Sequence, residues 1–189
     1  SFSFDLIPYP IIQLSERMAQ LYKDLASTEL WSQNIVDNTL NQIEYHLGVG
    51  GFANGEDALV LCDKLVELTH HMQQMAEHGY KSMPGVRASK DTGAPFALYH
   101  NEMVHTNNTI LANTVEGKVL FTTLSNPNFL RSTDQKLCEY MDNWFERVVK
   151  KSNSISQHAE KNREWFFNRI RRKIEQSRNR MATELGVQF

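Results

Sequence analysis

A long stretch without glycine or proline constrains this chain more than any other feature. Neither residue occurs between Pro127 and Gly186, so the 58 residues from 128 to 185 contain no strong helix breaker. Helices in globular proteins average about 11 residues. The stretch predicts one long C-terminal helix over residues 133–185, which would reach about 75 Å at ~1.5 Å per residue and would therefore protrude, bend or pair with another chain. Because Ser and Asn compete with the helical backbone, a break at residues 152–156 is the main alternative.

Further helices are expected where apolar residues recur at steps of three and four. Ser27 or Thr28 could cap the second of these helices, Asn54 the third, and Pro95 suits the first position of the fourth. Ser132 and Gln135 have the spacing of a capping box for the C-terminal helix. The four expected helices cover residues 10–26, 30–47, 55–79 and 96–113.

These elements predict an all-α protein. We expect an antiparallel bundle of four to five helices, with an unusually long C-terminal helix, that forms a single helical domain over residues 1–189. Alternating apolar residues at the N-terminus and the Val, Phe and Thr residues of 118–124 are typical of strands. A small β-ribbon that pairs these two segments would be a minor addition to the bundle.

Composition excludes several classes of protein. With 41% hydrophobic and 22% charged residues, the chain has ordinary globular usage, and no apolar run approaches the ~18 residues that a membrane span needs. Two cysteines are too few for a disulfide-stapled secreted module. We therefore expect an intracellular, cytoplasmic protein. A net charge of −2 gives the whole molecule no attraction to nucleic acid, so any basic surface must be local.

The most suggestive chemical pattern is a repeated Glu-x-x-His spacing. Glu67 with His70 and Glu102 with His105 would each share one face of an expected helix, as in di-iron helical bundles. Glu67, however, lies on the polar side of its helix, whereas a buried metal needs inward ligands. About 30 residues separate the two motifs, which leaves no room for an intervening helix. The sequence therefore predicts no metal and no cofactor, and a metal-dependent helical oxidase is a distant third hypothesis.

Motifs for nucleophilic or nucleotide chemistry are also missing from the sequence. It contains no Gly-x-Ser-x-Gly elbow, no phosphate-binding loop and no dinucleotide glycine fingerprint. We therefore expect a protein that is not an enzyme.

Charge is distributed very unevenly along the chain. Residues 161–180 hold eight basic and two acidic residues, a net charge of +6, whereas residues 1–132 hold eight basic and 14 acidic residues. Such a segment can hold phosphates, with aromatic side chains stacking on bases, or it can dock on an acidic protein surface. Its basic residues are Lys161, Arg163, Arg169, Arg171, Arg172, Lys173, Arg178 and Arg180.

These observations favour a non-catalytic assembly or interaction subunit. It would self-associate or dock on a partner protein through the C-terminal helix, because Trp and Arg concentrate binding energy at protein interfaces. The alternative is a nucleic-acid-binding or packaging protein that uses residues 161–180 for sequence-independent phosphate contacts. The expected interface residues are Trp144, Ile155, Trp165, Phe166 and Ile170.

Overall fold

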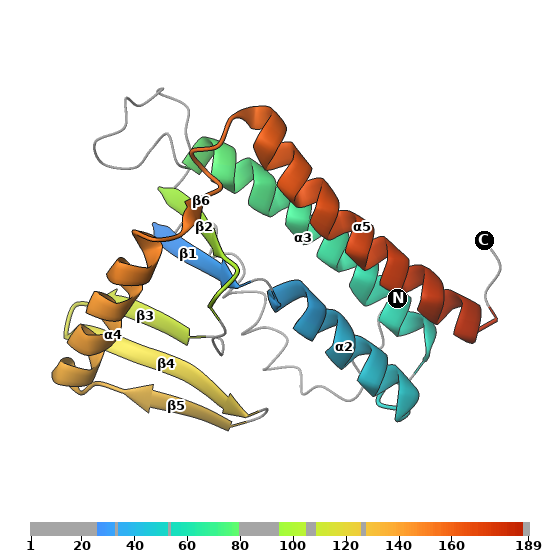
Figure 1. The fold of residues 1–189 in the computed structure, drawn as a ribbon. Coiled ribbons are helices and arrows are strands. Elements are labelled where there is room, and N and C mark those ends of the chain that lie inside the picture. The colour runs from blue at the N-terminus through green and yellow to red at the C-terminus, as the bar shows by residue number, and fades with distance from the viewer. Residues whose placement is uncertain are drawn as a thin grey trace. The chain divides into compact units, whose positions relative to one another are not determined.

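The protein combines helices with two small sheets, as a computed structural model shows (Figure 1). The structure describes residues 26–32, 34–52, 54–79, 95–104, 109–125 and 128–186. Its elements follow the chain in this order: β1 (Ser27–Ser32), α2 (Ile35–Gly48), α3 (Glu56–His78), β2 (Phe96–Asn101), β3 (Thr109–Thr114), β4 (Gly117–Ser125), β5 (Asn128–Ser132), α4 (Gln135–Val149), β6 (Asn153–Ser154) and α5 (Glu160–Glu184).

The described elements fall into two compact units. The first contains the helices α2, α3 and α5, and the second contains β3, β4, β5 and α4. A three-stranded sheet of order β1-β2-β6 holds the points at which the chain passes from one unit to the other. The sequence predicts one helical domain, whereas the structure divides the chain into these two units.

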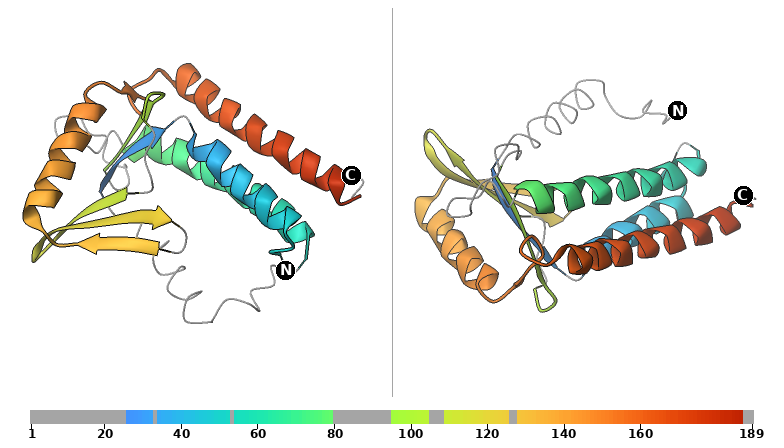
Figure 2. Two further views of the ribbon diagram at one scale, coloured as in Figure 1. Left: turned by 60° about the horizontal axis from the view of Figure 1, so that its bottom comes forward. Right: turned by 90° about the horizontal axis from the view of Figure 1, so that it is seen from above.

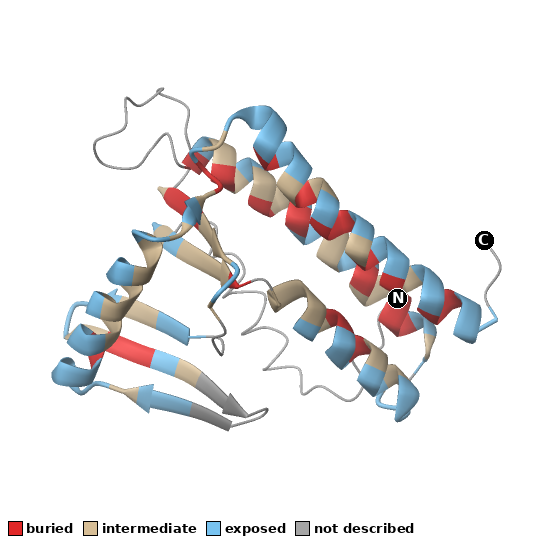
Figure 3. Cartoon of the chain, in the orientation of Figure 1, coloured by how far each residue is buried: buried red, intermediate tan, exposed pale blue. Residues whose placement is uncertain are grey.

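The core of the first unit lies where α5 packs along α3 and α2 (Figures 1 and 2). Apolar side chains recur at helical spacing on the facing sides of α3 and α5, so burial follows one stripe of each helix (Figure 3). Phe167 and Ile174 of α5 are among the largest fully buried side chains, and Cys62, Met72 and Ala76 are buried on α3. This packing orients α5 and decides which of its faces remain accessible.

The second unit is an antiparallel sheet with α4 packed against it. In the β3-β4 hairpin Leu111 pairs with Leu120, and Gly117 follows the two-residue turn with a φ of 122°, a conformation that L side chains rarely adopt. Leu120 and Cys138 are buried, and Lys118 forms an ion pair with Asp142 of α4.

The all-α prediction is wrong, because the structure has four helices and six strands in its described residues. The helix expected over 96–113 is instead the two strands β2 and β3. Residues 118–124 do belong to a strand, β4, which pairs with β3 and β5. Val, Ile, Thr and Phe suit a pleated surface, and packing against α4 outweighed the helical spacing and the favourable Pro95. The expected helix 10–26 and the N-terminal half of the ribbon lie outside the described residues.

The single helix expected over 133–185 is replaced by α4 and α5, with a break where the Ser and Asn residues lie. Ser152 Oγ donates to the carbonyl of Val148 (2.7 Å), which gives the end of α4 a side-chain partner. Beyond it, the amide of Ile155 donates to the carbonyl of Leu98 (2.9 Å), and the amide of Leu98 donates to Ser156 Oγ (2.9 Å). Hydrogen bonds to β2 thus fix the break that low helix propensity permits.

Helix starts differ from the expected ones by a few residues. Helix α2 begins at Ile35, because the expected cap residues Ser27 and Thr28 belong to β1. Asn54 does act at the start of α3, where its Oδ1 accepts from the amide of Glu56 (3.1 Å). The cap of α4 is Asp134, which accepts from the amide of Leu137 (2.9 Å), and Ser132 lies two residues earlier.

Candidate interaction surface on the C-terminal helix

Basic residues of α5 that face α3 are engaged within the chain. Arg178 grips Asp63 as a fork, with Nε to Oδ1 at 2.7 Å and Nη2 to Oδ2 at 3.2 Å. Arg163 is buried, and its Nη1 donates to the carbonyls of Ser156 (3.2 Å) and His158 (2.9 Å). These cations are parts of the fold.

The side of α5 that faces α2 is neutralised in the same way. Lys173 Nζ lies 2.8 Å from both carboxylate oxygens of Asp37. Arg180 Nη2 donates to Glu44 Oε1 (2.6 Å), which also accepts from Ser177 Oγ. The Ser177 hydrogen bond, opposed by partial burial and aided by Arg180, holds the pKa of Glu44 below its usual value.

Arg171 is a buried cation held by neutral groups. Its Nη2 donates to Gln73 Oε1 (2.9 Å) and Asn168 Oδ1 (2.7 Å), while its buried Nη1 has no hydrogen-bond partner among the described residues. Burial lowers the pKa of this guanidinium, although the nearby Glu164 and Glu175 oppose the shift. Arg171 therefore links α5 to α3 and offers nothing to an external partner.

A third side of α5 keeps its charges accessible. We call it the outward face and define it by Lys161, Trp165, Arg169, Arg172 and Gln176, all of which are exposed. In the described part of the chain no carboxylate pairs with Lys161, Arg169 or Arg172. Trp165 is 64% exposed, which is unusual for so large an apolar side chain. Arg169 lies over it, with Cζ 5.8 Å from the ring centroid.

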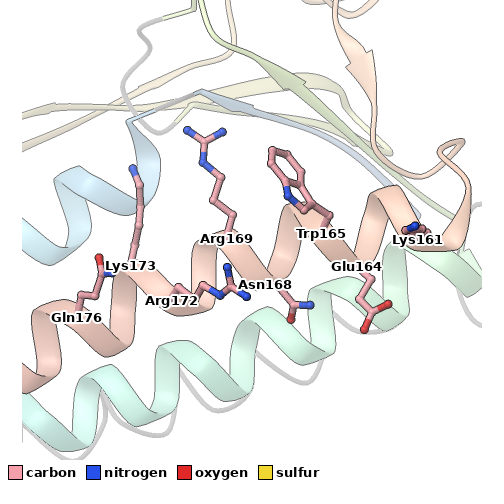
Figure 4. A pocket seen from close by; sticks show the side chains of 8 residues that line it. All are labelled: Lys161, Glu164, Trp165, Asn168, Arg169, Arg172, Lys173 and Gln176. Carbon is pink, nitrogen blue, oxygen red and sulfur yellow. The ribbon is translucent and has the colours of Figure 1, made fainter.

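The outward face carries a shallow open depression of about 500 Å³. Figure 4 shows Trp165 and Arg169 side by side, pointing away from α3, with Lys173 one turn further along. Glu164 is the one acidic residue among the described residues that line it. A guanidinium above an indole ring combines apolar area with positive charge, so the depression is suited to an anionic partner that also has an apolar part.

The structure separates the expected interface residues from one another. Ile155 and Ile170 are buried in the first unit, and Phe166 is half-buried with its ring 5.3 Å from that of Phe167. Trp144 is half-buried on α4, in the second unit. Of the five, Trp165 alone is exposed. The continuous stripe that the sequence predicts required one unbroken helix, which the chain does not form.

The carboxylates that neutralise α5 were missed by the sequence reasoning. Asp37 and Glu44 are seven residues apart on α2, and their partners Lys173 and Arg180 are seven residues apart on α5. This matching heptad spacing was the available signal. It could have shown that part of the basic segment is complementary to the acidic N-terminal part of the same chain.

The residues of the Glu-x-x-His pairs do not form a site in the structure. Glu67 is exposed and forms an ion pair with Lys64 (2.8 Å), His70 is exposed, and Glu102 lies in a turn after β2. His105 lies outside the described residues. Within the described ranges, no group of three or more His, Cys, Asp or Glu side chains is placed to hold a metal ion.

Both cysteines are free and buried. Burial, with the nearby Asp63, raises the pKa of Cys62 to about 11, so this thiol stays protonated at neutral pH and is a poor nucleophile. Among the helices that the structure describes, none combines the length and apolar character needed to cross a bilayer.

Comparison of the chain with protein-family models, with curated proteins and with solved structures finds no match.

Proposed function

We propose that this chain is a non-catalytic interaction protein that docks an acidic partner protein through the outward face of α5. The observation that carries the proposal is Trp165, 64% exposed beneath Arg169 on a helix whose other large apolar side chains are mostly buried. Trp and Arg are the residues most enriched at binding hot spots. Lys161 and Arg172 add positive charge on either side of this pair.

The cation count favours a protein over a nucleic acid. Sequence-independent binding to nucleic acid grows with the number of phosphates that Lys and Arg neutralise. Five of the eight basic residues at 161–180 are engaged inside the chain, which leaves three on the outward face. A net charge of +6 in the sequence thus becomes a small accessible charge beside one aromatic anchor.

Self-association is a narrower proposal than the sequence suggests. The sequence argument rests on a helix too long for its own globule, and α4 and α5 are two separate helices. What remains is the exposed Trp165, which a second copy of the chain could cover as well as a different protein. A reducing, cytoplasmic location is part of the proposal, because both cysteines are free and buried.

A matched pair of triple variants tests the proposed function. The outward triple variant changes Lys161, Arg169 and Arg172 to Gln. The control triple variant changes Arg131, Lys136 and Arg147 to Gln, and these residues are likewise exposed, form no ion pair in the described residues and comprise one Lys and two Arg. Affinity for poly-L-glutamate would be measured by fluorescence anisotropy at low salt, together with particle mass by light scattering.

We expect the outward triple variant to bind poly-L-glutamate about tenfold more weakly than the control triple variant. Equal losses in the two variants would mean that binding follows overall charge, and they would contradict the proposal. Loss of binding to a single-stranded oligonucleotide, with poly-L-glutamate binding unchanged, would favour the nucleic-acid alternative.

A further inference from the structure

We propose that the partner element is an acidic amphipathic helix that lies lengthwise along the outward face of α5. It would join α2, α3 and α5 as a fourth helix. This inference rests on the proposed function and adds the shape and charge of the partner. It is argued from how α5 already binds helices, from the spacing of the outward face and from the number of available charges.

Helix α5 already binds two acidic helices of its own chain. Asp37 and Glu44, one heptad apart on α2, meet Lys173 and Arg180, one heptad apart on α5. On α3, Asp63 meets Arg178, and the carboxylate of Glu77 lies 3.9 Å from Arg163. Carboxylates at helical spacing, opposite cations at the same spacing, are therefore the arrangement that this helix uses on its two covered sides.

The outward face repeats the spacing of those covered sides. Its members follow one another at steps of four, four, three and four residues from Lys161 to Gln176. That repeat forms a nearly straight ridge about 22 Å long, which suits packing into the groove of a second helix. Trp165 supplies the large apolar side chain that such packing buries, and the depression beside it gives a partner side chain room.

The available charge matches a helix with a few carboxylates. Lys161, Arg169 and Arg172 carry three positive charges, and Glu164 removes one from the surroundings of the depression. Three phosphate contacts on a single strand would give a salt slope of only about −2, too shallow for tight polynucleotide binding at physiological salt. On a helical partner the same cations would supplement the burial of Trp165.

Three probes of equal charge separate the possible partners. The first is an ~18-residue peptide, long enough to cover the ridge, with Glu at every third or fourth position along one face and Leu beside it. The second is a scrambled peptide of the same composition, and the third is a single-stranded oligothymidylate. Each is titrated against the full chain, the outward triple variant and the control triple variant, and peptide helicity is followed by circular dichroism.

We expect the amphipathic peptide to bind at least about tenfold more tightly than the scrambled peptide and the oligonucleotide, and to gain helicity on binding. Its affinity should fall about tenfold in the outward triple variant and in Trp165→Ala, and remain unchanged in the control triple variant. Equal affinity for the two peptides, tighter binding of the oligonucleotide, or binding without a gain of helicity would overturn the inference.

The outcomes for the partner and for the proposed function are distinct. If the scrambled peptide or the oligonucleotide binds best and loses affinity in the outward triple variant, the acidic-helix inference fails while the outward face remains a binding surface. If no probe depends on the outward face, the proposed function fails together with the inference.

Discussion

The covered sides of α5 and its outward face contain the same kinds of residue in different settings. On the covered sides, Arg163 and Arg178 meet carbonyls or carboxylates of the same chain, and Phe167 is fully buried. On the outward face, Arg169 and Trp165 contact each other and are exposed. Position on the helix, and not residue type, therefore decides which basic and aromatic residues stabilise the fold and which remain available for binding.

The largest expected difference between the two sides concerns their aromatic residues. Phe167→Ala should lower the free energy of unfolding by about 3–5 kcal/mol, because it empties a fully buried site. Trp165→Ala should change it by no more than about 0.5 kcal/mol, because the indole is mostly exposed. Urea denaturation measures both. A loss of several kcal/mol in Trp165→Ala would show that the indole stabilises the fold and would break the comparison.

A smaller difference is expected between two cations near the start of α5. Arg163→Met should cost about 2–3 kcal/mol of unfolding free energy, since the buried carbonyls of Ser156 and His158 lose a charged donor. Lys161→Met, two residues earlier, removes an exposed charge and should be within about 0.5 kcal/mol of the wild type. Similar denaturation midpoints for the two variants would contradict the assignment of Arg163 to the fold.

The contact between α2 and α5 should weaken in acid. Because the folded-state pKa of Glu44 is lowered, its stabilising contribution is present above its ordinary pKa of 4.5 and is lost as pH falls through the lower folded value. Glu44→Gln should therefore reduce the loss of stability between neutral pH and pH of about 3. The control is Glu184→Gln, at an exposed carboxylate for which the described residues offer no ion pair. Identical pH profiles for wild type and Glu44→Gln would contradict this account.

The smallest expected effect belongs to the half-exposed ion pair of Lys173 and Asp37. Lys173→Gln should cost about 0.5 kcal/mol at low salt and less at high salt, because exposed pairs gain little and are screened. Denaturation at two salt concentrations measures this difference. An effect above about 2 kcal/mol would mean that this side of α5 depends on charge far more than on its apolar contacts.

The sequence predicted the local helices better than the fold. Helix α3 follows its apolar stripe and its Asn54 start, because both signals lie within the helix. The pairing of Leu111 with Leu120 and the hydrogen bonds from Leu98 to the break before α5 join segments whose proximity no local pattern records. Helical spacing over 96–113 was therefore a poor guide to β2 and β3.

The candidate surface was predictable in part. Composition located the basic segment and identified Trp165, but accessibility depends on which cations meet Asp37, Glu44 and Asp63. Those contacts span more than a hundred residues of sequence. Ile155 and Ile170 were assigned to an interface because the break between α4 and α5, which the sequence left as an alternative, changes the face on which each residue lies.

The division of α5 into covered sides and an outward face is tested most directly by the affinity of the outward triple variant for the amphipathic acidic peptide, measured under conditions in which its unfolding midpoint is also known. The account predicts an affinity about tenfold below that of the wild type, with the midpoint unchanged. Unchanged affinity, with a midpoint that has fallen, would show that Lys161, Arg169 and Arg172 stabilise the fold, and it would contradict the account.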